Sequence, residues 1–543
     1  MTPIKLAILW HQHQPYYKAE GKFHLPWVRL HTTKDYAEMA EHIACFPKLH
    51  ATINLVPSLI GQIVSYMEGI EDDVLTLSRK PTDELTNDEK IYLLENCFHA
   101  NPERMIKRSA RYQELRKKTE QFTDEDYRDL VIHYALAWLG EFERKTEFYS
   151  YYIDKDRGYT EKEKDQLFSE LYTLFQYTLD IHRRLAASGQ IEISTTPFYH
   201  PILPLLCDTN SAHEAMPALA LPEKRFAAPR HAVEQVKRGL KFMDERFGNR
   251  PKGIWPSEGS ISNVALDVMS SQGVKWTASD EAVLLKSLRH FQYEELEKYF
   301  PRKYSSGDNE ITIFFRDHNL SDKIGFDYQS SKADDAVDDM IESIRDIRQA
   351  ILDRYGEEAL HNACIPIILD GENCWEYYEA NGYHFLQALY KALSEADDIQ
   401  TVTFSEAIAD IGSENIRPIE NITAGSWING NFKIWIGHQE KNEAWELLAD
   451  AAKLYDSLEG DDASFAQTKE LAFRELLKAE GSDWFWWYGD DHHSDHKDIF
   501  DELFRLHLAK FYSILGHELP DELLFPIGTT ASSSEYSSMH RSG

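Results

Sequence analysis

Short apolar runs, rich in Ile, Val and aromatic residues, recur along this chain and constrain its fold more than any other feature. They are 4-IKLAILW-10, 52-TINLV-56, 191-IEIST-195, 253-GIW-255, 274-VKWTA-278, 311-ITIFF-315, 365-IPIILD-370 and 401-TVTF-404. Runs this short and continuous are typical of strands buried on both faces of a parallel sheet. Amphipathic helical segments separate them, one of which contains Val337, Met340, Ile341 and Ile344. The βαβα order therefore predicts an α/β fold built on a TIM-like barrel.

Polar residues follow most of these runs. They are His11 and His13, Asn54, Glu258, Asp280 and Glu281, Arg316 to His318, Asp370 and Glu372, and Ser405 and Glu406, with Glu192 inside its run. In a parallel barrel the carboxyl ends of the strands converge on one face, which carries the chemistry. For any single cluster, the general tendency of loops to be polar is as good an explanation as a functional site. Recurrence along the chain favours one shared site.

The chain of 543 residues is too long for one ordinary hydrophobic core. We predict a catalytic barrel over residues 1–410, with a charged helical insertion at about 60–188. The pattern after residue 410 is helical, which predicts a C-terminal helical domain over 411–527 that contributes to the cleft. The Ser-rich tail, 528–543, is expected to be disordered.

The net charge and the cysteines indicate which binding partners and which cell compartment to expect. Lys and Arg number 58 against 91 Asp and Glu, a net charge of −33 that disfavours nucleic acid and anionic membranes as partners. The five cysteines are scattered and include no CxxC pair, which favours a reducing compartment. The N-terminal apolar run is too short for a signal peptide, and no segment is apolar enough to span a bilayer. We expect a cytoplasmic protein.

Two segments suggest glycosidic bond cleavage. The stretch 367-IILDGENCWEYY-378 places Asp370 and Glu372 after a core strand and beside aromatic residues, and 253-GIWPSEGSIS-262 places Glu258 among small residues. Paired carboxyl groups can handle the proton and the cationic transition state, while aromatic rings stack on sugar faces. The structural alternative for such an acid is a helix cap or a turn.

Other chemistries have weaker support. A metal-dependent hydrolase could use 11-HQH-13 or 490-DDHHSDHKD-498, but no HExxH occurs and the second segment is more typical of a solvated loop. The chain also contains no phosphate-binding glycine loop and no GxSxG elbow. A non-catalytic sugar-binding protein remains a candidate, although the paired acids argue against it.

Four segments, in order, resemble the motifs of glycoside hydrolase family 57, whose members are retaining enzymes acting on α-glucans. They are 10-WHQHQPYY-17, 189-GQIEISTTPFYHPILPLL-206, 254-IWPSEGSIS-262 and 369-LDGENCW-375. The resemblance implies an incomplete barrel of seven strands followed by a helical region. One of the eight runs should therefore lie outside the barrel. The runs 401-TVTF-404 and 274-VKWTA-278 are the last two that we would exclude from it.

The resemblance also implies roles for particular residues. Glu258 would be the nucleophile, and Asp370 the general acid and base, with a pKa raised by neighbours such as Glu258 and Glu372. The resemblance further implies that His13, Glu192 and Glu372 surround the sugar at the cleavage point. Our other candidates for substrate binding are His11, His200, Trp255, Arg316, His318, Trp375 and Trp427. Trp10 is a further stacking candidate, although its position inside a strand favours the barrel core. We expect no cofactor and no metal.

The segments 425-GSWINGNFKIWIGHQ-439, 483-DWFWWYGDDH-492 and 314-FFRDHNLSDKIGF-326 resemble hydrolase-type members of this family. We therefore expect an α-amylase or amylopullulanase activity on α-1,4 and potentially α-1,6 bonds. The alternatives are a 4-α-glucanotransferase or 1,4-α-glucan branching enzyme of the same family, and a non-catalytic glucan-binding protein. The partner implied is an α-glucan or malto-oligosaccharide.

Overall fold

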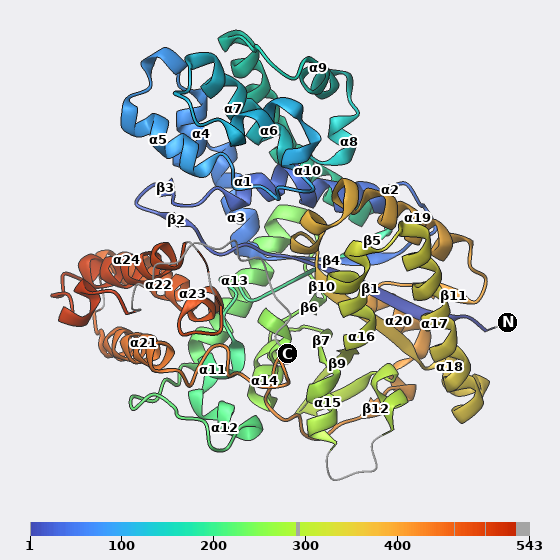
Figure 1. Ribbon diagram of the computed structural model, residues 1–543. Helices are drawn as coiled ribbons and strands as arrows, with labels where there is room; N and C mark the ends of the chain where they lie inside the picture. Colours follow the sequence, from blue (N-terminus) through green and yellow to red (C-terminus); the bar gives the residue numbers. More distant parts are fainter. Residues whose placement is uncertain (1, 289–293, 461, 493, 495, 528–543) are drawn as a thin grey trace.

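The computed structural model describes residues 2–288, 294–460, 462–492, 494 and 496–527; the tail predicted to be disordered lies outside them. Seven of the predicted runs form the parallel strands of one sheet (Figure 1). In spatial order they are β10 (Cys364–Asp370), β1 (Ile4–Gln12), β4 (Ala51–Leu55), β5 (Ile191–Thr195), β6 (Gly253–Ile254), β7 (Trp276–Asp280) and β9 (Asn309–Arg316). The predicted α/β fold is confirmed.

The two outer strands of this series, β9 and β10, are joined by individual hydrogen bonds. The backbone N–H of Asp317 donates to the carbonyl of Pro366 at 2.9 Å, and Arg316 Nε donates to the carbonyl of Ile368 at 2.7 Å. On its other edge β9 pairs with the antiparallel β8 (Arg302–Ser306), which pairs in turn with β12 (Arg417–Pro418). The strands thus form an incomplete barrel of the TIM type.

The run at 401–404 is the one outside the barrel, so the expectation that it would be among the last removed is wrong. Strand β11 (Ile399–Thr401) pairs with the start of β1 and ends before Val402. Thr403 then caps helix α20 (Phe404–Ile411): its hydroxyl accepts from the N–H of Glu406, whose carboxylate accepts from the N–H of Thr403. A reciprocal cap of this kind starts a helix and ends the strand.

Helix α20 closes one end of the barrel. Phe404 stacks on Trp276, with ring centroids 4.6 Å apart. Both belong to an interior cluster whose members are Ala7, Leu9, Trp255, Trp276, Ala278, Phe314, Cys364, Ile368, Val402, Phe404 and Ala407. Gly253 has to be glycine here, because a Cβ would lie 1.8 Å from the Trp276 ring. The amino-terminal end of the barrel is therefore filled, which leaves its carboxyl end for a ligand.

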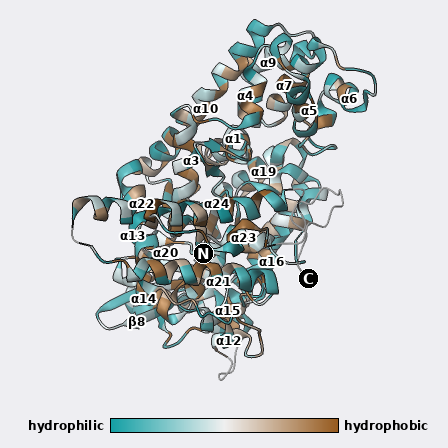
Figure 2. Cartoon of the chain, turned by 90° about the vertical axis from the view of Figure 1, so that its left-hand side faces the viewer, coloured by the Kyte–Doolittle hydropathy of each residue, from teal (hydrophilic) through white to brown (hydrophobic). Residues whose placement is uncertain are grey.

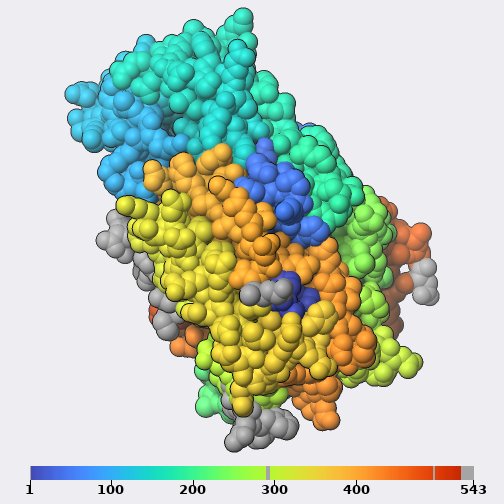
Figure 3. Space-filling model, turned by 90° about the vertical axis from the view of Figure 1, so that its right-hand side faces the viewer, coloured from blue at the N-terminus to red at the C-terminus, as the bar shows by residue number. Residues whose placement is uncertain are grey.

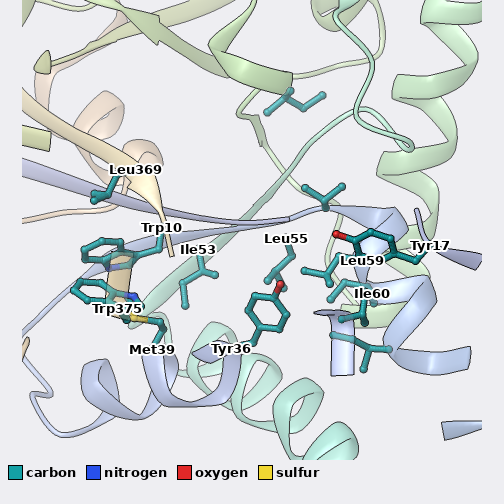
Figure 4. Packing of buried hydrophobic residues seen from close by; sticks show 14 of the residues in the cluster. Trp10, Tyr17, Tyr36, Met39, Ile53, Leu55, Leu59, Ile60, Leu369 and Trp375 are labelled. Carbon is teal, nitrogen blue, oxygen red and sulfur yellow. The ribbon is translucent and has the colours of Figure 1, made fainter. Parts of the chain in front are cut away.

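Alternate side chains of β1 point outward into a second apolar layer. Figure 4 shows Trp10 of this layer packed beside Trp375, Met39 and Leu369. Trp10 Nε1 donates to the hydroxyl of Tyr390 at 2.9 Å, so the polar atom of the buried ring is satisfied. The core interpretation of Trp10 is confirmed.

Helices surround the sheet. The helices α17 (Ala333–Tyr355) and α19 (Tyr383–Glu395) cover the face seen in Figure 3, in yellow and orange. Between β4 and β5 the chain runs through α3 (Pro57–Met67) to the long α10 (Glu161–Ser188), and the helices between them gather in a separate group at the top of Figure 1. These intermediate helices are α4 (Asp73–Arg79), α5 (Asn87–Asn96), α6 (Ala110–Lys117), α7 (Asp124–Ala137), α8 (Glu141–Arg144) and α9 (Glu147–Lys155).

The last part of the described chain is helical. Its helices are α21 (Gln439–Ser457), α22 (Ala463–Ala479), α23 (Ser482–Trp487) and α24 (Lys497–Leu515), which group on the left of Figure 1. Figure 2 shows hydrophilic and hydrophobic residues alternating along the helices, as expected where one side of each is packed. The division at residue 410 stays a prediction, since β12 still belongs to the sheet. Within the described ranges no helix has the length and apolar character that crossing a bilayer requires.

Candidate active site

The strand register brings several of the predicted residues to one end of the sheet. His11 of β1 lies opposite Asn54 of β4 and opposite Asp370 of β10. Likewise, Arg316 of β9 lies opposite Asp280 of β7. Because parallel strands end on the same side, these side chains surround the carboxyl end of the barrel.

His11 is held in one orientation. Side chains alternate along a strand, so His11 shares the inner face of β1 with Ala7 and Leu9. Its Nδ1 donates to Asn54 Oδ1 at 2.8 Å, and Asn54 Nδ2 donates to Ser194 Oγ at 3.0 Å. Burial, followed by the nearby His13, lowers the pKa of His11 to about 3. His11 is therefore a neutral imidazole at neutral pH.

Glu258 lies in a strained turn after β6. Its backbone is left-handed, with φ of 58°, and a conformation of this kind in a residue other than glycine is frequently found at functional sites. The carbonyl of Glu258 accepts from the N–H of Trp427 at 2.9 Å, and Oε2 accepts from Trp427 Nε1 at 2.8 Å. Burial and the charge of Asp370 raise the pKa of Glu258 to about 8, against the opposing effect of the Trp427 hydrogen bond.

Asp370 ends β10, and burial raises its pKa to about 6. His13, a hydrogen bond from Asn373 and the charge of Arg316 act in the opposite direction. The expected direction of the shift is confirmed, although burial rather than a neighbouring carboxylate is its main cause. The charge of Asp370 raises the pKa of Glu258, so we expect the two to titrate as a pair that carries one proton between pH values of about 6 and 8.

Two histidines lie beside Glu258. The rings of His13 and His200 are stacked, with centroids 3.8 Å apart and planes 15° from parallel. His200 Nδ1 is 4.0 Å from Glu258 Oε1, and burial lowers the pKa of His200 well below its usual value. Like Glu258, His200 has a left-handed backbone, with φ of 57°. The fold thus holds both residues in unfavourable conformations next to each other.

Helix α23 completes this cluster with residues that the sequence analysis did not single out. Asp483 Oδ1 accepts from His13 Nε2 at 2.8 Å, and Ser482 Oγ hydrogen-bonds to His200 Nδ1 at 2.9 Å. Gly481 allows the close approach, because a Cβ there would lie 2.8 Å from the carbonyl of Tyr199. The only available signal was an acid preceding the aromatic run 484-WFWWY-488, and sequence spacing could not relate it to His13.

Glu372 supports the loop that carries His13. Its Oε1 accepts from the N–H of His13 at 3.1 Å, while Oε2 is buried without a hydrogen-bond partner among the described residues. Burial and the charge of Asp370 raise the pKa of Glu372 well above its usual value. A protonated carboxyl group there can donate its hydrogen to a ligand oxygen.

Arg316 and His318 form a charged edge of the site. Arg316 donates to Asp280 and Asp322, and its guanidinium lies 5.5 Å from the centre of the Trp427 ring. Hydrogen bonds that its imidazole donates to Asp280 and Asp322 raise the pKa of His318 to about 10. His318 is therefore a half-exposed cation at neutral pH, whereas Arg316 is buried and orients Trp427.

Two predicted stacking residues offer no exposed ring. Trp255 is 0% exposed inside the barrel, and Trp375 is 1% exposed in the outer layer. Neither can stack on a sugar in this structure, so that expectation is wrong for both, because the strand ends turn these rings into the core. Trp427 is partly exposed and contacts Glu258, so it alone of the three can meet a ligand.

Glu192 lies away from the other candidates. It pairs in register with Thr52, two residues before the level of Asn54, and faces the filled end of the barrel. Its Oε1 accepts from Trp276 Nε1 at 2.8 Å, and its Oε2 accepts from the N–H of Ser405 at 2.9 Å. The expected position of Glu192 beside the sugar is wrong, because its carboxylate holds the start of α20.

A Glu192→Gln variant is expected to lose stability and to keep its activity. The amide would turn a donor toward Ser405 or Trp276, leaving a buried polar group unsatisfied and lowering the free energy of unfolding by about 1–3 kcal/mol. Urea denaturation and kcat/KM should be measured on the same preparation. Lost activity with unchanged unfolding would instead support the role that the resemblance implies.

Comparisons with known proteins identify the family and the fold. The model of glycosyl hydrolase family 57 matches residues 7–422, a span that begins within β1 and includes all the later strands of the incomplete barrel. A 98-residue stretch is 26% identical to Alpha-amylase 1 of Dictyoglomus thermophilum, covering 18% of this chain and 11% of that protein. The match to this relative is therefore confined to a small part of its length.

Two solved structures share the fold over nearly the whole chain. A family 57 branching enzyme from Thermococcus kodakaraensis has a TM-score of 0.63 and 16% identity, with 96% of this chain and 93% of that chain covered. The α-amylase AmyC of Thermotoga maritima has a TM-score of 0.58 and 15% identity, with 96% of each chain covered. At this identity the likeness establishes the fold alone, and the family match extends over most of the sequence. The chain belongs to glycosyl hydrolase family 57.

Proposed function

We propose that this protein is a retaining glycoside hydrolase that cleaves α-glucans. The observation that carries the proposal is the pair formed by Glu258 and Asp370 at the carboxyl end of the barrel, whose pKa values are raised to about 8 and about 6. A pair that holds one proton near neutral pH contains the two forms that retention needs, one acid and one carboxylate.

In the proposed mechanism Asp370 donates its proton to the glycosidic oxygen as Glu258 attacks the anomeric carbon. The bond to the leaving sugar breaks and a glycosyl ester forms on Glu258. Asp370, now ionised, takes a proton from water, which attacks the anomeric carbon and releases Glu258. Two inversions leave the product with the α configuration, and we predict carboxyl groups about 5–5.5 Å apart when substrate is bound.

The position of the shared proton has to change when substrate binds. In the ligand-free protein the higher pKa of Glu258 places the proton there, whereas cleavage needs it on Asp370. Trp427 Nε1 already donates to Glu258 Oε2, which favours the Glu258 anion. A glycosidic oxygen against Asp370 would accept a hydrogen bond from its protonated form, so substrate itself favours the reactive arrangement.

The neighbouring groups are suited to bind the sugar at the cleavage point. His11 is a neutral imidazole, Glu372 can donate a hydrogen from a protonated carboxyl group, and His13 is held by Asp483. These groups combine donors and acceptors, as sugar hydroxyls require. Trp427 is our candidate for ring stacking on a glucose unit.

Hydrolysis and glucan transfer differ in the second step, where water or a sugar hydroxyl attacks the glycosyl ester. We favour hydrolysis because the segments around Trp427 and Arg316 resemble hydrolase-type members. The branching enzyme with the same fold supports transfer as the second candidate. A catalytically inactive glucan-binding protein is the candidate from another class.

Product analysis tests these candidates. The protein is incubated with maltoheptaose, amylose and pullulan, with Glu258→Gln as the blank, and products are resolved by size, linkage and anomeric configuration. Hydrolysis gives only shorter products, initially in the α form, and cutting of pullulan adds α-1,6 activity. Longer or branched products would establish a transferase. Saturable binding without any product would contradict the catalytic proposal.

A Trp427→Phe variant is expected to lower kcat and to move the alkaline limb of the pH profile to higher pH. Phe keeps an aromatic face but removes the N–H that donates to Glu258 Oε2. Without that donor the pKa of Glu258, the higher of the pair, rises further, so the pair loses its second proton at higher pH. Less of the enzyme then holds the shared proton on Asp370, and kcat falls about tenfold. The measurement is kcat/KM against pH; an unchanged alkaline limb would show that this hydrogen bond does not tune Glu258.

A further inference from the structure

We infer that His13, His200 and Asp483 form a binding site for a divalent transition metal ion, and that the ion inhibits the enzyme by covering Glu258. The inhibitory consequence rests on the proposed function, whereas the binding site does not. The ion is a blocking ligand in this inference and takes no part in the cleavage reaction.

The geometry carries the site. One ligand atom of each residue lies within 4.8 Å of a ligand atom of each of the other two residues. Among the described residues, these three side chains form the one group of potential metal ligands that lie this close together. His13 Nε2 and Asp483 Oδ1 are 2.8 Å apart. Two ligands of one tetrahedral zinc ion at ~2.0–2.2 Å lie about 3.3 Å apart, so the pair has to open by about half an ångström. Rotation of these two side chains can supply that movement.

The two imidazoles also have unused nitrogen atoms. His13 Nδ1 and His200 Nε2 are buried and have no hydrogen-bond partner among the described residues. Histidine can bind a metal ion through either ring nitrogen. Each ring can therefore turn so that one nitrogen binds the ion in place of its present hydrogen bond. Glu258 Oε1 lies 4.0 Å from His200 Nδ1 and is a candidate fourth ligand.

The donor set and the surrounding charge select the class of ion. Two imidazoles and one carboxylate suit Zn²⁺, Cu²⁺ or Ni²⁺, whereas Ca²⁺ and Mg²⁺ prefer sets made only of oxygen. The pair Glu258 and Asp370 carries one negative charge near neutral pH beside the cluster, in a chain of net charge −33. Such a field attracts divalent cations.

An ion at this site would have two effects. It would occupy the space beside Glu258 and engage His13, so a sugar could not reach either residue. It would also join three separate segments: His13 follows β1, His200 follows β5, and Asp483 lies in α23. Binding to the folded state alone raises the melting temperature by mass action. We expect inhibition by Zn²⁺ that is competitive with glucan, together with a zinc-dependent rise in Tm.

The test uses the full chain after treatment with a chelator. Titration with ZnCl₂ by calorimetry should show one tightly bound ion per chain, and Co²⁺ should develop the visible absorption of a site with nitrogen and oxygen ligands. Asp483→Asn and His13→Gln should each weaken Zn²⁺ binding at least tenfold. His50→Gln is the matched control, because His50 pairs with Glu406 outside the site and should leave binding and activity unchanged.

Three results would overturn the site. They are no saturable Zn²⁺ binding, binding by Asp483→Asn and His13→Gln as tight as that of the wild type, or loss of binding only when His492 and His496 of the segment 490–498 are replaced.

Hydrolysis of maltoheptaose decides the inhibitory role. Chelation should leave or raise the rate, and Zn²⁺ should halve it near the dissociation constant measured by calorimetry. If chelation abolished activity, the inhibitory role would be wrong. If the protein cleaved no glucan, the proposed function would fail while the calorimetric result still decided the site.

Discussion

Glu258→Gln is expected to lower kcat on amylose by about 10⁴-fold or more while leaving the fold and Tm close to those of the wild type. The amide cannot attack the anomeric carbon, and the first step has no other nucleophile in the proposed mechanism. Gln is nearly isosteric and keeps an oxygen to accept from Trp427 Nε1, so local packing is preserved. Amylose turnover and thermal unfolding are the two measurements.

A smaller side chain at the same position gives a sharper test. In Glu258→Ala, azide can enter the vacated space and attack the anomeric carbon from the same side as the carboxylate. The expected product is a β-glycosyl azide, formed as azide bonds to carbon and the protonated leaving sugar departs. Glu192→Gln serves as the control, since that carboxylate faces the opposite end of the barrel. Wild-type turnover in Glu258→Gln would contradict the assignment.

Asp370→Asn is expected to lower kcat on amylose by about 10²–10⁴-fold, the usual contribution of a positioned general acid. The loss should depend on the leaving group. A nitrophenyl α-maltoside releases a phenolate that needs little protonation, so formation of the glycosyl ester should be almost as fast as in the wild type. Pre-steady-state release of nitrophenol measures this step. An equal loss on both substrates would show that Asp370 is not the acid.

The same pair predicts the pH profile of the wild type. Below a pH of about 6 both carboxyl groups are protonated and the nucleophile is lost; above about 8 both are ionised and the acid is lost. A plot of kcat/KM against pH should therefore be bell-shaped, with an optimum near pH 7. In Asp370→Asn the alkaline limb should disappear. A profile flat from pH 5 to 9 would contradict a shared proton.

Local pattern predicted the strands well and failed where the chain changes from strand to helix. The seven barrel strands were found because strands buried on both faces are continuous apolar runs. At 401-TVTF-404 the same composition misled, since Thr403 and Glu406 form a helix cap and Phe404 fills the barrel. Capping depends on side chains three residues apart and outweighs apolar content there.

Burial separated the aromatic candidates in a way that composition could not. Trp255, Trp375 and Trp427 all follow strands or lie in loops and have equal apolar character. Trp255 and Trp375 pack inward, whereas Trp427 is held against Glu258 by a backbone and a side-chain hydrogen bond. Which face of a ring stays exposed is decided by neighbours distant in sequence, and these are known only after folding.

The sequence by itself determined the sheet, the family and the two acids at the ends of β6 and β10, because each depends on residues that are adjacent along the chain. Only the tertiary structure decided that Glu192 supports the closed end of the barrel, and that Asp483 and Ser482 join His13 and His200 beside Glu258. Those contacts link residues that are 213 to 470 positions apart. No local pattern encodes such separations, since they arise from the way in which the helices after the barrel pack back onto its strand ends.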